Sequence, residues 1–445
     1  MQWRLVNACV RYDFYSLPLS ISFDIRGSTV KTKQLVAYVG LFLIGIVSLL
    51  VVKQSDATNL QQGLPGVVAE IDAGRFPSLQ AALDHVPETG GIVRIPAGVF
   101  EISEPLVITT EDTRIEGAGA ATHIKNVNAD GKPTIMLRPE SRDDDTKARI
   151  WRLQLGNFRI SGTESCGDGI LAEGVNEIFI QGVSIDHHGG HGIHMVDCYE
   201  DPRIADCIIT YNKKAGIYIK NGHDIVVNAN QFEENEDALV CVDSFNLCMN
   251  GNNLDDHLRH GVVIENTYGS VLSGNMIEEC MGTAIILDRD CYGITLSANV
   301  IAHDMGGGVD LRDAHGCAIS ANTFTLLHHF SVRVSENSSR NTISANSFCN
   351  SHIGNAEKRK LVDENNDPVR IDIGTGILLE STKDITVCGN TFSGLDGAAV
   401  NAKGTCDHVL VSSNVIVDIN RRTEDSEEVF VVDADAKVTI LSNLQ

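Results

Sequence analysis

One pattern recurs along the second half of the chain and constrains its fold more than any other feature. Each copy has two short stretches of alternating apolar residues around a polar turn and closes with an asparagine, as in residues 308–324 (GVDLRDAHGCAISANTF). The closing asparagines are Asn230, Asn252, Asn275, Asn299, Asn322, Asn346, Asn390 and Asn414. Successive asparagines are 22, 23, 24, 23, 24, 44 and 24 residues apart, and we interpret the interval of 44 as two repeats. Because a period of this length built from short strands is typical of a solenoid, we predict an all-β, right-handed parallel β-helix with rungs of about 22–24 residues.

The asparagines themselves are expected to be structural. Side-chain amides stacked at one turn position can hydrogen-bond to each other and to the backbone of the next rung. We therefore predict a continuous ladder of amides and assign it no chemistry.

Composition agrees with a single large solenoid domain. The chain has 445 residues, 40 of them glycine, and only 5% aromatic residues, so its core must come from Val, Ile and Leu in strands. The formal net charge of −24 argues against nucleic-acid binding, which needs a basic stripe. An acidic polysaccharide would need local cations or a bound metal ion such as Ca²⁺.

The N-terminal part predicts export. Residues 35–52 are a continuous apolar run that follows Lys31 and Lys33, as in a secretory signal peptide or a membrane anchor. Because an ordinary signal would begin near Val30, we expect residues 1–29 to be an extension or Val30 to be the true start. We assign residues 1–54 to this extension and signal, 55–66 to a polar linker and 67–445 to the β-helix. The expected location is extracellular or periplasmic, either free or attached to a membrane through residues 35–52.

Residues 76–86 (FPSLQAALDHV) have apolar side chains at helical spacing behind a proline and a serine. A solenoid needs its first rung covered, since unpaired strand edges invite association. We therefore predict a short N-terminal capping helix.

The next segment carries a family resemblance. A strand with a P-x-G-x-[YF] turn at residues 96–100 is followed by a G-x-G turn at residues 117–119. This opening resembles the pectate-lyase-like superfamily of carbohydrate-active β-helix proteins. The resemblance implies the right-handed β-helix fold and does not specify a reaction, because lyases, hydrolases, epimerases and phage or surface proteins share it.

Aligning the first strand of each rung predicts which side chains face outward. The third residue of each strand should point out, and these residues are Leu171, His194, Tyr218, Val240, Val263, Ile286, Asp310, Arg333, Leu378, Asn401 and Val431. A second outward column contains Lys220, Val242 or Asp243, Glu265, Asp288, Arg312 and Glu380. Rungs about 4.8 Å apart would join these columns into one face along which a chain-like ligand can lie.

A histidine-rich part of this face suggests proton transfer. β-Elimination from a uronate needs a base for the C5 proton and a cation that stabilises the enolate. The residues suited to this on two adjacent rungs are His191, His194, Lys214, Tyr218 and Lys220. Lyases and C5-epimerases share this first step, so the alternatives stay open.

A second motif resembles the polygalacturonase family. Residues 235–238 (NEDA) are followed one rung later by His260 and Gly261, as that family's G-D-D turn is followed by G-H-G. The resemblance implies catalytic roles for Asp237 and His260 in inverting hydrolysis. The upstream N-x-D of the family is replaced by residues 212–216 (NKKAG).

Charged residues further along the face are candidates for substrate binding. These residues are Lys220, Asp288, Asp310, Arg312 and Arg333. Asp310 and Arg333 lie on adjacent rungs, so an ion pair between them is the structural alternative. Between the two polar regions, Val240, Val263 and Ile286 form an outward aliphatic strip that either underlies a loop or contacts another subunit in a homo-oligomer.

Two other features complete the sequence. Residues 351–374 form a polar insertion that we expect to overhang the same face. The 12 cysteines follow no zinc-binding pattern, so we expect small buried side chains and leave one or two disulfides open.

The leading hypothesis is a secreted enzyme that acts on an extracellular polysaccharide, as a uronate lyase or C5-epimerase. A glycoside hydrolase that uses carboxylates such as Asp237 and Asp310 is the alternative enzyme. A non-catalytic surface or adhesion solenoid is the alternative from another class.

Overall fold

The structure is a computed structural model that describes residues 66–349, 374–421 and 428–445. Residues 68–445 form one compact unit. The expected signal and anchor, and nearly all of the linker at 55–66 and of the insertion at 351–374, lie outside the described residues. Among the helices of the described ranges, none is long and apolar enough to cross a membrane.

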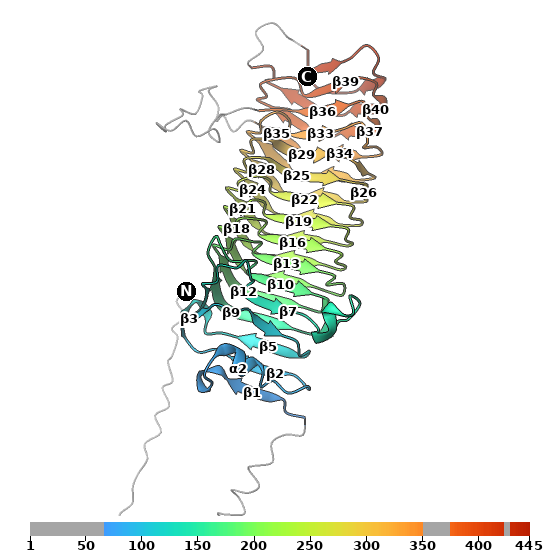
Figure 1. The fold of residues 1–445 in the computed structure, drawn as a ribbon. Helices are drawn as coiled ribbons and strands as arrows, with labels where there is room; N and C mark the ends of the chain where they lie inside the picture. The colour runs from blue at the N-terminus through green and yellow to red at the C-terminus, as the bar shows by residue number, and fades with distance from the viewer. Residues whose placement is uncertain (1–65, 350–373, 422–427) are drawn as a thin grey trace, which may run out of the picture. The chain divides into compact units, whose positions relative to one another are not determined.

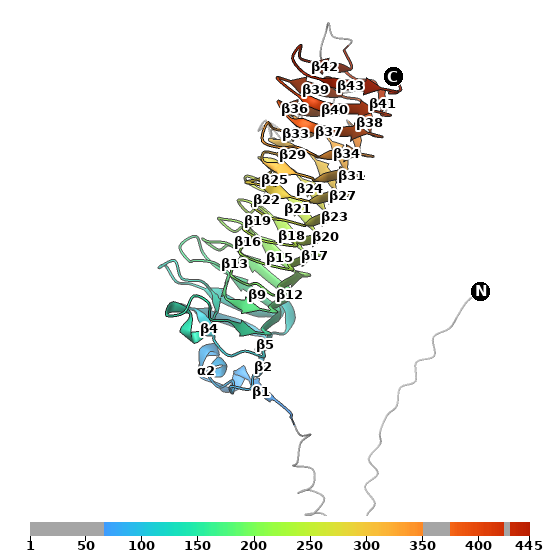
Figure 2. The same cartoon turned by 90° about the vertical axis from the view of Figure 1, so that its right-hand side faces the viewer.

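The fold is a right-handed β-solenoid in which each typical rung contributes three short strands, and each strand pairs in parallel with its counterparts on the neighbouring rungs (Figures 1 and 2). The predicted fold class is confirmed. The first strands of the rungs form a 13-stranded sheet made of β4 (Leu106–Ile108), β7 (Ile135–Leu137), β10 (Ile170–Glu173), β13 (Ile193–Val196), β16 (Ile217–Lys220), β19 (Leu239–Val242), β22 (Val262–Glu265), β25 (Thr283–Asp288), β29 (Gly307–Leu311), β33 (Val332–Val334), β36 (Ile377–Glu380), β39 (Val400–Lys403) and β42 (Phe430–Val432).

The second and third strands form two stacks that share β9 (Gln154–Ser161) and β12 (Phe179–Asp186), and together make a 26-stranded sheet. The second-strand stack continues with β1 (Ala69–Asp72), β2 (Gly91–Arg94), β5 (Thr113–Glu116), β14 (Arg203–Ala205), β17 (Val226–Asn228), β20 (Cys248–Asn250), β23 (Val271–Ser273), β27 (Thr295–Ser297), β31 (Ala318–Ser320), β34 (Thr342–Ser344), β37 (Lys383–Cys388), β40 (Asp407–Ser412) and β43 (Val438–Leu441). The third-strand stack contains β3 (Gly98–Ile102), β6 (Thr122–Asn126), β15 (Ile208–Thr210), β18 (Gln231–Glu233), β21 (Asn253–Asp255), β24 (Met276–Glu278), β28 (Val300–Ala302), β32 (Thr323–Thr325), β35 (Ser347–Cys349), β38 (Thr391–Ser393) and β41 (Val415–Val417). Two small pairs are β8 (Ile150–Trp151) with β11 (Val175–Asn176) and β26 (Cys291–Tyr292) with β30 (Ala314–His315).

The register of the 13-stranded sheet is the one predicted from side-chain alternation. Leu171 is opposite His194, His194 is opposite Tyr218, and the column continues in this way to Val431. The residues on either side of this column, such as Ile193 and Met195, are fully buried in the core. The sequence pattern therefore places the outward column correctly.

The asparagine ladder is present and corrects one interpretation. Asn322 donates its backbone N–H and its side-chain Nδ2 to Oδ1 of Asn346, at 2.9 and 3.0 Å. Asn346 makes the same two bonds directly to Asn390, at 2.9 and 3.0 Å, so the interval of 44 residues is a single rung with an insertion and not two repeats. At the other end, Asn414 bonds in the same way to Asn443 at 2.9 Å, which extends the ladder by one rung.

The predicted capping helix is α2 (Leu79–Leu83), with 3₁₀ turns at Ala73–Arg75, Gly119–Ala121 and Glu140–Asp143 elsewhere. Ser78 caps it by accepting the backbone N–H of Ala81 at 3.1 Å. From this helix, the Gln80 side chain accepts the N–H of Val107 at 2.8 Å and donates to its carbonyl at 3.0 Å. Val107 lies on β4, the edge strand of the 13-stranded sheet, so the helix satisfies backbone groups that a bare edge would expose.

The cysteines behave as small core side chains. All eleven in the described part of the chain are free thiols, and most of them are buried. Burial raises the pKa of Cys241 to about 11 and that of Cys198 to about 12, so these thiols are un-ionised near neutral pH.

The aliphatic strip is less exposed than the alternation suggests. The exposed fractions of Val240 and Ile286 are 9% and 1%, although both occupy the outward column. Val240 packs with Ala215, Tyr218 and Val263 in a small apolar cluster outside the main core. At these two positions the strip is covered within the chain.

Candidate functional site

Two adjacent rungs bring three rings together on the outward face of the 13-stranded sheet. His194 on β13 and Tyr218 on β16 are direct partners in the register, and His191 lies in the turn before β13. The ring centroid of His191 is 5.0 Å from that of His194 and 4.8 Å from that of Tyr218. The ring centroids of His194 and Tyr218 are 5.2 Å apart. The structure therefore unites three of the residues predicted to take part in proton transfer.

A carboxylate that sequence reasoning missed organises this cluster. Asp168 precedes β10, and its Oδ1 accepts the backbone N–H of His191 at 2.7 Å. Its Oδ2 is 2.8 Å from Nδ1 of His194. The sequence pattern could have identified Asp168, because it directly precedes the glycine that opens its rung. His191, Asp237 and His260 likewise precede the small residue that opens their rungs. We call Asp168, His191, His194 and Tyr218 the histidine cluster.

Burial and hydrogen bonds shift the pKa values of three residues of this cluster. Burial lowers the pKa of His191 to about 4, although the charge of Asp168 opposes the shift, so the imidazole is neutral near pH 7. Its Nδ1 is buried and has no hydrogen-bond partner among the described residues. Burial also raises the pKa of Tyr218, with the charges of Glu265 and Asp243 adding to the effect. For Asp168, burial opposes ionisation, but hydrogen bonds from His194 and His191 outweigh it and lower the pKa.

The two lysines predicted to take part in the site, Lys214 and Lys220, lie at different distances from the histidine cluster. The ammonium of Lys214 is close enough to His191 to contribute to the lowering of its pKa. Lys220 is at the end of β16, exposed, and opposite Val196 and Val242 in the register, one strand position beyond Ile219. Lys214 thus belongs with the histidine cluster, whereas Lys220 stands at the edge of the face.

Asp237 and His260 also lie together, but arginine occupies the carboxylate. Asp237 accepts the backbone N–H of His260 at 3.0 Å and Nε of Arg259 at 2.8 Å, and Nη2 of Arg259 bonds to its second oxygen. The Asp237 side chain is 1% exposed. Nδ1 of His260 accepts the backbone N–H of Thr283 at 3.0 Å, so one imidazole nitrogen is also engaged.

Asp310 is held in the same manner. Nε of Arg333 donates to its Oδ1 at 2.8 Å and Nε of Arg312 donates to its Oδ2 at 2.7 Å. The Asp310 side chain is fully buried, and Arg312 also lies 3.9 Å from Asp288. The ion pair between Asp310 and Arg333 that the sequence suggested is confirmed, and only the arginines offer donors to a ligand.

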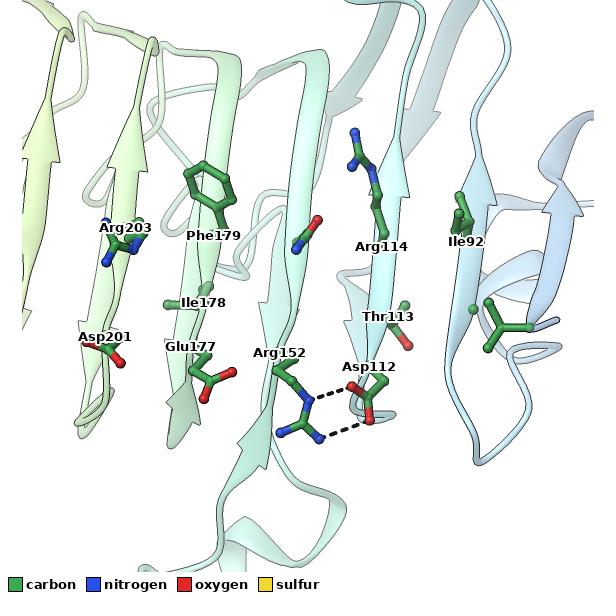
Figure 3. Close-up of a pocket in the computed structure, with 13 residues that line it drawn as sticks. Ile92, Asp112, Thr113, Arg114, Arg152, Glu177, Ile178, Phe179, Asp201 and Arg203 are labelled. Atoms are coloured by element: carbon green, nitrogen blue, oxygen red, sulfur yellow. Dashed lines mark hydrogen bonds and ion pairs between the residues drawn. The ribbon is translucent and has the colours of Figure 1, made fainter. Parts of the chain in front are cut away.

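Two open hollows lie away from these residues. One, of about 610 Å³, is on the second-strand stack of the first rungs, where Arg152 pairs with Asp112 and Phe179 and Arg203 also line the wall (Figure 3). The other, of about 700 Å³, is on the third-strand stack and is lined by His123, Arg159 and Tyr211. The predicted site residues line neither hollow.

In the described part of the chain, three clusters place potential metal ligands within 4.8 Å of one another. One is Asp168, His191 and His194, and the others are Glu200 with His223 and Asp224, and Asp255 with Asp256 and Glu279. Of these three clusters, only the first contains residues that the sequence analysis named as site candidates. It is also the only one of the three with two imidazoles, which come from one rung, while its carboxylate comes from the rung before.

Comparison with known proteins agrees with the architecture. No curated protein sequence matches the chain. Among solved structures, a DFA-IIIase mutant from Arthrobacter chlorophenolicus A6, in complex with DFA-III, is 11% identical with a TM-score of 0.51, covering 76% of this chain and 98% of its own. The Dettilon tailspike protein is 12% identical with a TM-score of 0.50, covering 84% and 70%. The A-module of the mannuronan C-5 epimerase AlgE6 from Azotobacter vinelandii is 16% identical with a TM-score of 0.48, covering 84% and 98%.

At these identities, the DFA-IIIase and the tailspike protein show a shared fold and no shared activity. The family model for the right-handed beta helix region matches residues 151–301 and 283–444, which is most of the described solenoid. The parallel register, the asparagine ladder and this match lead to one conclusion: the chain belongs to the right-handed β-helix family.

Proposed function

We propose that the protein is a carbohydrate-active enzyme that removes the C5 proton of a uronate in an extracellular polysaccharide, as a lyase or a C5-epimerase. The observation that carries the proposal is the histidine cluster on the outward face of the 13-stranded sheet. It joins imidazoles, a phenol and a nearby ammonium, which are the groups that this chemistry uses.

The reaction needs proton transfer and charge stabilisation. A base takes the proton from C5, which is acidic because it is α to the carboxylate, and the negative charge moves onto that carboxylate. In a lyase the C4–O bond then breaks, a double bond forms between C4 and C5, and an acid protonates the leaving oxygen. In an epimerase a proton returns to C5 from the opposite face. The imidazoles and Tyr218 supply the base and the acid, and the ammonium of Lys214 is a nearby cation.

The carboxylates proposed for hydrolysis are poorly placed for it. Inverting hydrolysis needs one free carboxylic acid and one free carboxylate. Asp237 is held by Arg259, and Asp310 is held by Arg312 and Arg333. Both carboxylates are buried, so neither is free to act on a glycosidic oxygen or on water.

Incubation with a panel of uronate polysaccharides tests the proposal. A lyase produces an ultraviolet-absorbing unsaturated end, and an epimerase changes the C5 stereochemistry seen by NMR. A hydrolase produces new reducing ends without that absorbance and would overturn the proposal. Binding of a glycan without any chemical change would also overturn it, in favour of an adhesive role.

We also propose that the protein is exported, on the strength of the apolar run at residues 35–52 behind Lys31 and Lys33. Fractionation of the producing cells, followed by N-terminal sequencing of the native product, tests this. Recovery of the native protein from the cytosol would contradict it.

A further inference from the structure

We propose that Asp168, His191 and His194 bind one divalent transition-metal ion of the zinc type. Their potential ligand atoms lie within 4.8 Å of one another. Imidazole nitrogens and a carboxylate oxygen bind such ions at about 2.0–2.2 Å, which brings the ligand atoms to roughly 3–3.5 Å from each other. Small side-chain rotations are therefore enough to close the site.

Comparison with the two buried carboxylates of this face, Asp237 and Asp310, shows which partner Asp168 lacks. Asp237 is neutralised by Arg259, and Asp310 is neutralised by Arg312 and Arg333. Asp168 accepts the backbone N–H of the next rung just as Asp237 does, yet its only ion pair within the described ranges is with an imidazole, that of His194. The Asp168 side chain is only 16% exposed, and an ionised carboxylate at that depth favours a compensating charge, which no arginine provides here.

The surrounding groups suit a metal ion in that role. Nδ1 of His191 is buried, and no hydrogen bond to it is found in the described part of the chain. A buried polar atom without a hydrogen-bond partner calls for an explanation. A bound metal ion would explain it and would also use the neighbouring imidazole of His194. The backbone N–H of His191 meanwhile fixes Oδ1 of Asp168 at 2.7 Å, as groups behind metal ligands commonly do.

Three protein ligands leave at least one coordination position open, which is typical of catalytic sites. A cation there would face the same open surface as Tyr218, whose ring centroid is 4.8 Å from that of His191. The catalytic part of this inference rests on the proposed function. It assigns the neutralisation of the uronate carboxylate to the metal ion, makes His191 and His194 its ligands, and leaves proton transfer to Tyr218.

Metal binding can be measured without any glycan. The full chain is stripped with a chelator and titrated with Co²⁺, followed by visible absorption and by calorimetry. We expect one ion per chain, a visible spectrum of low-coordinate Co²⁺ and its displacement by Zn²⁺. In His194→Gln and Asp168→Asn the affinity should fall on the order of 100-fold or more, since loss of even a supporting residue commonly costs 10-fold to 100-fold.

The matched control is His187→Gln, because this histidine is on the same rung with a side chain that is 60% exposed. It should bind Co²⁺ as the unchanged protein does. Thermal midpoints with and without Co²⁺ guard against misfolding: the ion should raise the midpoint of the unchanged protein and leave that of His194→Gln where it was. Absence of stoichiometric binding, or equal binding in His194→Gln, would overturn the proposal.

The two proposals fail separately. Full conversion of a uronate glycan by chelator-stripped protein would overturn the catalytic role of the metal ion and leave the lyase or epimerase proposal standing. Stoichiometric Co²⁺ binding that depends on His194, with no conversion of any uronate glycan, would support the site and overturn the proposed function.

Discussion

Nε of Arg333 donates to Oδ1 of Asp310 at 2.8 Å across one rung, and Arg312 occupies the other oxygen of this fully buried carboxylate at 2.7 Å. Arg333 also lies over the ring of Phe330, at 4.7 Å from its centroid. The two guanidinium groups are partly exposed, so the carboxylate orients them toward the face on which a ligand would lie.

This arrangement predicts that Asp310→Ala is destabilising. Removing the carboxylate leaves two arginines without their buried partner, and breaking a buried ion pair commonly costs about 3–5 kcal/mol. The thermal midpoint should fall clearly. In the control Glu101→Ala, which removes an exposed carboxylate paired with Lys125, it should barely change. An unchanged midpoint in Asp310→Ala would show that the network contributes no stability.

The asparagine ladder predicts a second stability effect. Asn322 donates to Asn346 and to the carbonyl of Leu296 at 2.9 Å, and its Oδ1 accepts both N–H groups of Asn299 at 3.0 Å. Asn322→Ala leaves several buried polar groups unpaired, and each commonly costs about 1–3 kcal/mol. We expect a loss of several kcal/mol, measured by denaturant titration.

The matched control for the ladder is Asn253→Ala. Its amide makes a single bond to Gln231 at 3.0 Å and is only partly buried. A loss of about 1 kcal/mol or less is expected there. Equal losses in Asn253→Ala and Asn322→Ala would contradict the idea that the ladder, rather than any amide, stabilises the stack.

Asp304 predicts a pH effect. Burial raises its pKa well above the usual range, with the charges of Glu278 and Glu279 adding to this, and its Oδ2 has no partner among the described residues. Its Oδ1 accepts the backbone N–H of Cys280 at 3.0 Å, just as Oδ1 of Asn212 accepts that of His188 at 3.1 Å. Asp304 therefore occupies a position that suits an amide.

A raised carboxyl pKa gives stability that is complete below the usual pKa of about 3.9 and is lost as the pH rises. Asp304→Asn removes this loss. The variant should therefore be more stable than the unchanged protein at pH 7 to 8, and the difference should shrink toward pH 4. Thermal midpoints across this range check the sign, and a variant that is less stable at pH 8 would contradict the assignment.

His257 predicts the opposite dependence. It is fully buried in the same turn column, and burial lowers its pKa to about 4. A lowered histidine pKa gives stability that is present above the usual value of about 6.5 and is lost as the pH falls toward 4. A shift of this size corresponds to roughly 3 kcal/mol. His257→Gln should therefore reduce the fall of the thermal midpoint between pH 6.5 and pH 4. An equally large fall in the variant and in the unchanged protein would contradict this.

The sequence was enough to predict the fold and the register because both depend on local, repeated chemistry. Alternation decides which face each side chain takes, so His194, Tyr218 and Asp310 were placed on the outward column correctly. The depth of each position was not predictable in this way. Asp310 and Ile286 share the outward column with His194, yet both are buried, since covering depends on turns and long side chains.

The same limit explains the missed partners. Asp168 and Arg259 act through contacts that join one rung to the next, and a pattern within one rung does not show which carboxylate receives an arginine and which receives a histidine. The interval of 44 residues was misjudged because an insertion of about one period's length looks like a repeat, until the pairing of β34 with β37 is seen.

The activity prediction concerns Tyr218. Its hydroxyl is the one phenol that the outward column places beside both histidines of the cluster, with ring centroids 4.8 and 5.2 Å away. A positioned acid or base commonly contributes about 10²-fold to 10⁴-fold to the rate. Tyr218→Phe should lower kcat on the responsive uronate glycan by this order, with little change in thermal midpoint because the ring and its packing against Val240 and Val263 are kept. The control is Tyr211→Phe. Tyr211 lines the hollow on the third-strand stack, where its ring stacks with His187, and this variant should retain full activity. Full kcat in Tyr218→Phe would exclude the phenol from proton transfer.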